Sequence, residues 1–110
     1  MNSGIEITLD RPRRVKYTFV TFKTLQLRLG NKAVGDIFTD LTKLDVNSLQ
    51  TVLWVGLLHE DRSLRYDKVE EFIERYIEDG HTVGDLLHVI NEAVKESGFF
   101  GRDQNQESKS

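Results

Sequence analysis

Histidines and carboxylates are the side chains of this sequence that could hold a metal ion. His59-Glu60 begins like the zinc-protease helix motif, which needs a second histidine one turn later, but that position is Ser63. The other two histidines, His81 and His88, are about two helical turns apart and have no adequate third ligand nearby. Because tetrahedral zinc needs at least three converging protein ligands, we predict no metal site.

Carboxylates could also serve as a general acid and base, and one short stretch contains Glu60, Asp61, Asp67, Glu70, Glu71 and Glu74. Catalytic carboxylates need unequal, partly buried environments. The six carboxylates of this stretch belong instead to a polar link and to the polar face of a predicted helix, where acidic residues in the first turn are stabilising. The sequence also lacks cysteine, a glycine-rich phosphate loop and a recognisable nucleophile with its base. We therefore predict that the protein is not an enzyme and binds no cofactor, since an active site would have to be completed by another chain.

Four basic residues lie between Arg11 and Lys16, next to Tyr17, Phe19 and Phe22. Basic residues beside aromatic ones can bind nucleic acid, so the alternative function is a small nucleic-acid-binding regulatory protein that uses this basic hairpin. Two other interpretations compete with it. The stretch could be a solvated turn, or it could contact an acidic partner such as the C-terminal half of the same chain.

Charge is unevenly distributed along the 110 residues. Residues 1–50 contain eight Lys/Arg and five Asp/Glu, whereas residues 51–110 contain seven and thirteen, so the two halves carry +3 and −6. A nucleic-acid binder normally has a dominant basic face. The split favours contact with complementary protein surfaces or with other copies of the chain, so we predict self-association and disfavour nucleic acid as a partner.

Length and composition indicate one domain over residues 1–100. No stretch of about 18 consecutive apolar residues and no signal peptide is present, so no membrane partner is predicted. The lack of cysteine suits a reducing compartment, and the cytoplasm is the expected location. Residues 101–110 have no apolar side chain to offset the entropy of ordering, which predicts a disordered polar tail.

The elements that position these side chains begin with two strands in residues 1–20. Ile5, Ile7 and Leu9 alternate along one predicted strand, and the run Val15–Val20 is rich in β-branched and aromatic residues. Pro12 falls in the connection, where its missing N–H donor does no harm. This pattern predicts an N-terminal β-hairpin.

Apolar residues at helical spacing predict helices in residues 21–98. The predicted spans are Thr21–Leu29, Ala33–Leu41, Ser48–Leu58, Asp67–Glu78 and Thr82–Ser97. Capping boxes are predicted for Asn47 with Gln50, for Asp67 with Glu70 and for Thr82 with Asp85. The fold class is therefore mainly α, a compact bundle of about five short helices with a small N-terminal β-hairpin.

Glycines and apolar residues refine this arrangement. Gly30 and Gly80 are predicted to end two of the helices. The third helix is apolar around almost its whole circumference, which indicates a central element, and Gly56 within it would permit close helix packing.

Aromatic residues are the best candidates for a protein-binding surface. Trp54 could be a binding hot spot, although its nearly all-apolar helix favours a place in the core. Phe99 and Phe100 follow a helix stop at the edge of the polar tail. They either fold back onto the core or stay available to a partner.

One run of residues is similar to a known family. It is Val52-Leu53-Trp54-Val55-Gly56-Leu57-Leu58-His59-Glu60-Asp61, followed by Ser63-Leu64, Tyr66-Asp67 and a helix with Val69, Phe72 and Ile73. With Leu29-Gly30 ending an earlier helix and Ser97-Gly98 ending the last, it resembles the tail assembly chaperones of long-tailed bacteriophages and prophages. The resemblance covers about Lys16 to Gly98. Arg62 and Arg65 stand where proline and threonine are common in the family.

The resemblance implies a non-catalytic role. Members of that family coat the helical tape measure protein, keep it soluble and help to recruit tail tube subunits, in the cytoplasm of the bacterial host and outside the mature virion. Many exist in a short form and a frameshifted longer form, which would diverge in the polar tail. The expected protein-binding residues are Trp54, His59, Glu60, Asp61, Leu64, Phe99 and Phe100.

Overall fold

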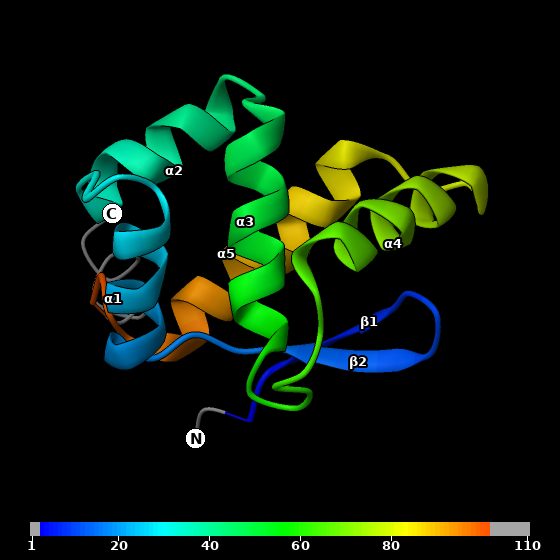
Figure 1. The fold of residues 1–110 in the computed structure, drawn as a ribbon, viewed down its shortest axis with the longest axis horizontal. Helices are drawn as coiled ribbons and strands as arrows, with labels where there is room; N and C mark the ends of the chain where they lie inside the picture. Colours follow the sequence, from blue (N-terminus) through cyan, green and yellow to red (C-terminus); the bar gives the residue numbers. More distant parts are fainter. Residues whose placement is uncertain (1–2, 102–110) are drawn as a thin grey trace, which may run out of the picture.

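A computed structural model describes residues 3–101 and confirms the predicted fold class (Figure 1). Its elements are β1 (Ile5–Thr8), β2 (Pro12–Val15), α1 (Phe19–Arg28), α2 (Val34–Thr42), α3 (Val46–Leu57), α4 (Tyr66–Glu78) and α5 (Val83–Ser97). The predicted disordered tail lies, except for Gly101, outside the described residues. Among the helices of residues 3–101, none is long and apolar enough to cross a membrane.

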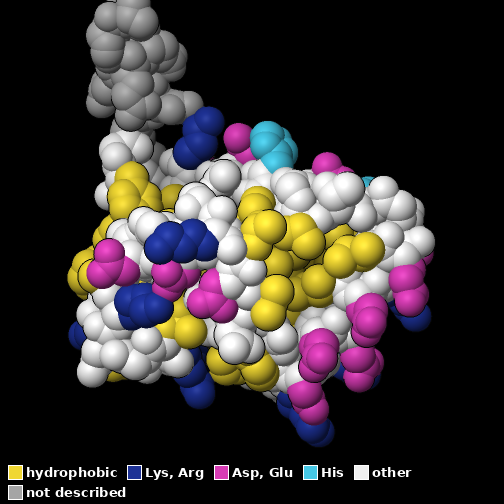
Figure 2. All heavy atoms as spheres, turned by 90° about the horizontal axis from the view of Figure 1, so that it is seen from above, with side chains coloured by type: hydrophobic (Ala, Val, Ile, Leu, Met, Phe, Trp, Pro, Cys, Tyr) yellow, Lys and Arg dark blue, Asp and Glu magenta, His cyan; other side chains and the backbone are white. Residues whose placement is uncertain are grey.

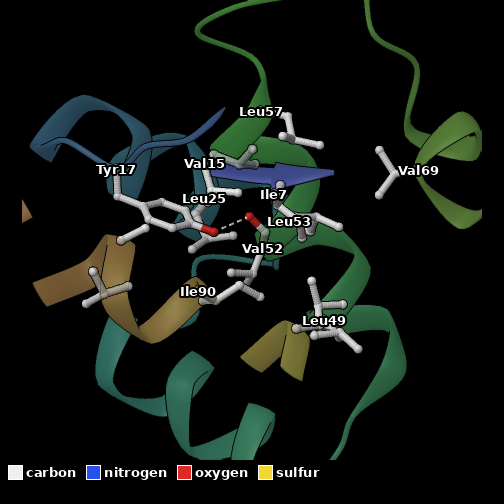
Figure 3. Packing of buried hydrophobic residues seen from close by; sticks show 14 of the residues in the cluster. Ile7, Val15, Tyr17, Leu25, Leu49, Val52, Leu53, Leu57, Val69 and Ile90 are labelled. Carbon is white, nitrogen blue, oxygen red and sulfur yellow. Dashed lines mark hydrogen bonds between the residues drawn. The ribbon is translucent and has the colours of Figure 1, made fainter. Parts of the chain in front are cut away.

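Helix α3 is the central element of the fold, as its all-round apolar character predicts. It contacts α1, α2, α4 and β2, and Figure 1 shows it standing between α1 and α4. Val52 and Leu53 are completely buried in a core to which the hairpin and α5 also contribute, through residues such as Val15 and Ile90 (Figure 3). Burial on several sides makes α3 the scaffold for the other elements.

The predicted second strand, Val15–Val20, is wrong in its position. Strand β2 ends at Val15 and pairs antiparallel with β1, whereas Phe19 already begins α1. The reason is a reciprocal cap at the start of that helix. The Thr21 N–H donates to the Thr18 hydroxyl and the Thr18 N–H donates to the Thr21 hydroxyl, so two backbone donors are satisfied by a helix start where the residue types favour a strand.

Two of the three predicted capping boxes are also wrong. The cap of α3 is Asp45, whose carboxylate accepts a hydrogen bond from the Asn47 N–H, so the helix begins before the predicted Asn47 cap. Helix α4 begins at Tyr66 without a side-chain cap, and Asp67 lies inside its first turn, bonded to Arg65. An aspartate is favourable both as the cap residue and within the first turn of a helix. The presence of an aspartate therefore does not show which residue begins the helix.

The remaining helix signals agree with the structure. Thr82 and Asp85 form the predicted capping box of α5. Gly30 and Gly80 adopt positive φ angles of 73° and 106° directly after the last turns of α1 and α4. Helix α2 ends in the same kind of turn, but the residue with positive φ there is Leu44, at 63°. Nothing in the sequence indicated that position, because leucine seldom takes this conformation.

Candidate functional site

The link between α3 and α4, which contains four of the predicted binding residues, is bound to the edge of the hairpin. His59 Nε2 lies 2.7 Å from the carbonyl oxygen of Arg14, and the Glu60 carboxylate accepts a hydrogen bond from the Arg14 N–H at 3.0 Å. These contacts occupy backbone groups of β2 that β1 does not use. The link therefore covers a strand edge that would otherwise be open to pairing.

Arg13 projects from the same strand toward the interior and is only 4% exposed. Its guanidinium makes two hydrogen bonds to Asp10, at 2.6 and 2.9 Å, and its Nη1 lies 3.5 Å from Asp61. The guanidinium carbon is 4.8 Å from the ring centre of Phe72, a cation–π distance. Hydrogen bonding to Arg13 lowers the pKa of the Asp10 carboxyl below its ordinary value of 3.8. Arg13 is thus a structural cation that connects the hairpin, the link and α4.

Most of the basic stretch is occupied by contacts within the chain. Arg11 forms an ion pair with Asp61 at 3.9 Å, and the Arg14 guanidinium donates to the carbonyl of Gly4 at 2.8 Å. The pKa of Asp61 is lowered, chiefly by a hydrogen bond from Ser63 and secondarily by Arg13. Of the interpretations left open by the sequence, contact with the acidic C-terminal half of the chain is the one seen for Arg11 and Arg13.

Trp54 and Leu64 anchor the link to α3. The indole N–H of Trp54 donates to the carbonyl of Leu64 at 2.9 Å, and its ring meets that of Tyr66 edge to face. On another side the Arg28 guanidinium carbon lies 4.9 Å from the ring centre. Trp54 is half-buried and Leu64 is buried, so both side chains are already engaged by the chain itself.

Phe99 and Phe100 lie in an aromatic cluster that includes five of the six phenylalanines of the chain. The buried ring of Phe22 is at its centre, 4.4 Å from Phe99 and 6.2 Å from both Phe38 and Phe100. Phe19 lies 6.3 Å from Phe99. We define the phenylalanine surface as the four rings around Phe22, of which Phe19 is 70%, Phe100 54% and Phe99 40% exposed.

This surface combines two of the predicted binding residues with two that were not predicted. Phe99 and Phe100 pack against Phe22 and are also partly exposed, so they fold back onto the core without being covered by it. Phe19 and Phe38 come from α1 and α2, far from them in sequence. No local pattern signals such a meeting, because it depends on how helices pack.

A second open apolar feature, which was not predicted from the sequence, lies between α3, α4 and α5. It is a groove of about 370 Å³ lined by Val46, Asn47, Leu49, Gln50, Glu70, Ile73, Glu74, Ile77 and Val83. We call it the acid-rimmed groove. The view onto the start of α3 shows a broad apolar area with acidic side chains gathered along one edge (Figure 2).

Two of the three histidines, His59 and His81, make contacts within the fold. Besides His59 on the hairpin, His81 stacks on Tyr76 at 4.2 Å and lies 3.9 Å from Asp85. Within residues 3–101 no three of the His, Asp and Glu side chains are grouped so that they could hold a metal ion.

Comparison with known proteins adds a family. Residues 22–110 match the model of DUF6096, a family of unknown function. No curated protein matches the chain. No solved structure matches it either. The matched region runs from α1 to the C-terminus and covers most of the sequence, so the chain belongs to the DUF6096 family.

Proposed function

We propose that this protein is a tail assembly chaperone of a long-tailed bacteriophage or prophage. In this role it binds the helical tape measure protein, keeps it soluble and helps to recruit tail tube subunits without catalysing a reaction. It acts in the cytoplasm of the bacterial host and is left out of the mature virion. The observation that supports protein binding best is the phenylalanine surface.

The phenylalanine surface has the physical properties of a contact site. A phenylalanine ring buries roughly 150 to 250 Å² when covered, and each exposed ring on this surface leaves much of that area to a partner. Packing against Phe22 holds the rings of Phe99 and Phe100 in place, so these two side chains lose little conformational entropy on binding. Rings also accept apolar side chains of different shapes, which suits a long helical client with a varied sequence.

Two further features bear on this role. The run of residues that resembles tail assembly chaperones includes Trp54, Glu60 and Asp61, and in this structure these three residues hold the α3–α4 link in place. The unequal charges of the two halves suit association of several copies, which a chaperone for a long client requires. Self-association is therefore part of the proposal.

The test is co-expression with a tape-measure-type helical protein encoded nearby. We expect that client to become soluble and to co-purify with this chain, and we expect a Phe19→Ala, Phe100→Ala double variant to retain much less of it. Leu44→Ala is the matched control, because Leu44 is an exposed apolar residue outside the phenylalanine surface. A client that aggregates while this protein stays soluble would contradict the proposal.

The nucleic-acid alternative has weaker support from the contacts of the basic hairpin. Arg13 is buried between two carboxylates, and Arg11 shares one of them. A phosphate would have to compete with Asp10 and Asp61 for these cations. We therefore propose protein binding rather than nucleic-acid binding.

A further inference from the structure

We propose that the acid-rimmed groove binds an amphipathic helix of a partner protein, with apolar residues one turn apart on one face and Lys or Arg on both sides of that face. The groove is separate from the phenylalanine surface, since no residue belongs to both. The inference goes beyond the proposed function, because it concerns another surface and does not depend on the identity of the client.

The floor of the groove is apolar and comes from three helices. Val46 is 71% and Ile77 46% exposed, and Ile73 and Val83 are partly buried. Leu49 closes the base from α3. Because these residues belong to regular helices, the shape is largely formed before a partner arrives, as in other grooves that accept a helix.

The rim of the groove is acidic. Glu70 and Glu74 line it from α4, and its lining contains no Lys or Arg. Neither carboxylate has an ion-pair partner among residues 3–101. On a helix, residues four apart lie on the same side, so the two negative charges follow one edge of the apolar floor. A partner with basic residues beside its apolar stripe would match both features.

Other occupants fit less well. An added β-strand needs a free sheet edge, and this groove is formed by helices alone. The phosphates of a nucleic acid would face Glu70 and Glu74 with like charge. A second copy could offer α1, where Val20 and Leu27 are exposed, but only Lys23 lies between them in that exposed stripe. One lysine leaves one of the two rim carboxylates, Glu70 or Glu74, without a counterpart.

The probe is a labelled, end-capped peptide of about 18 residues, long enough to form a helix, with leucines one turn apart flanked by lysines. Two comparison peptides keep the leucines but carry glutamates at the flanks, or keep the composition but scramble the spacing. Fluorescence anisotropy with the full-length chain should show tight binding of the first peptide alone. Ile77→Asp and Val46→Asp should each weaken it by about tenfold or more, because both place a charge on the apolar floor.

Glu74→Lys should also weaken binding about tenfold, since it reverses a charge on the rim. Its matched control is Glu71→Lys, which makes the same change on the same helix, but beside Arg13 and Phe72 instead of in the groove. Circular dichroism checks that each variant is folded. Equal binding of the lysine and glutamate peptides, or equal loss in both lysine variants, would overturn the proposal. So would sedimentation showing a dimer of the chain that Ile77→Asp dissociates, because a second copy would then fill the groove.

Discussion

The ring of Tyr17 lies directly against the backbone of Gly56. A β-carbon placed on Gly56 would be 2.8 Å from the ring carbon that bears the hydroxyl and 2.8 Å from the hydroxyl oxygen. The same hydroxyl donates a hydrogen bond to the carbonyl of Val52 at 2.7 Å (Figure 3). The N–H of Lys16 donates to the carbonyl of Gly56. The chain after β2 thus packs onto α3 at the one position of that helix that lacks a side chain.

Gly56→Ala should destabilise the protein by about 1 to 3 kcal/mol, the usual cost of overfilling a packed core. The reason is that Tyr17 and Val15 both come within 2.8 Å of the new methyl group. Urea unfolding followed by circular dichroism measures the change. Gly35→Ala is the control, because Gly35 is also helical but has nothing within 4 Å, and it should stabilise by about 0.5 to 1 kcal/mol. A neutral Gly56→Ala would show that the Tyr17 contact is not tight.

Tyr17→Phe should alter stability at alkaline pH. Burial raises the pKa of Tyr17 above its ordinary value of 10.0, so the unfolded chain loses this proton at lower pH than the folded one. The stability that the protonated Tyr17 contributes is therefore fully present below pH 10.0 and is lost as pH rises above it. In Tyr17→Phe the free energy of unfolding should fall less steeply above that pH, although it should be lower by about 1 kcal/mol at neutral pH because a buried hydrogen bond is lost.

A second tyrosine also contributes to the alkaline dependence of stability. The pKa of Tyr76 is also raised, by burial and then by Asp85, and this residue keeps some alkaline dependence in every variant. If Tyr17→Phe and the parent show the same slope, the Tyr17 phenol is accessible to ionisation in the folded protein.

Arg13→Met should lower stability at neutral pH and make the remaining stability less sensitive to acid. Arg13 lowers the pKa of Asp10, so this contribution is present above pH 3.8 and is lost as pH falls through the lower pKa of the folded state. Without the Arg13 cation, the part of the stability that depends on ionised Asp10 disappears. The difference in unfolding free energy between variant and parent should therefore shrink toward pH 2. Unfolding free energies measured between pH 2 and pH 7 test this.

Arg65→Met is the matched control for Arg13→Met. Arg65 also pairs with an aspartate, Asp67, but both side chains are largely exposed, so solvent screens the pair and the loss of stability should be much smaller than for Arg13→Met. If both methionine variants behave alike, Arg13 contributes no more than a surface ion pair.

Leu44→Gly should stabilise the protein by about 1 kcal/mol, because a residue with a side chain is strained in the left-handed region. Leu44 has φ of 63°, and the N–H groups of Leu44 and Asp45 donate to the carbonyls of Leu41 and Asp40, the turn that normally ends a helix with glycine. A domain of this size should then melt about 4 to 8 °C higher. Scanning calorimetry gives the value.

Asn31→Gly is the control for Leu44→Gly. Asn31 also has a positive φ, of 64°, but asparagine tolerates this conformation, so the gain should be smaller. A melting temperature of Leu44→Gly at or below that of the parent would mean that the exposed leucine contributes packing greater than its backbone strain.

Local patterns in the sequence were sufficient to predict the number and type of the elements. Hydrophobic spacing is a local property, and it located five helices and identified α3 as central, while Gly30 and Gly80 marked two helix ends. Boundaries were less certain where competing local signals exist. Thr18 begins a helix within a run of strand-forming residues, and Asp45 replaces Asn47 as the cap of α3. In both cases the helix start is set by a hydrogen bond from a backbone N–H in the first turn to the side chain of the cap residue.

The contacts between side chains that are distant in sequence could not be predicted and are known from the fold alone. Phe19 and Phe38 join Phe99 and Phe100 on one surface, and three helices enclose the acid-rimmed groove. Arg13 is interior although its neighbours in sequence suggested a basic patch, because strand register turns it toward Asp10 and Asp61. The physical reason is that residue type and spacing specify an element and its apolar face, whereas contacts between distant segments depend on the packing of all the elements together.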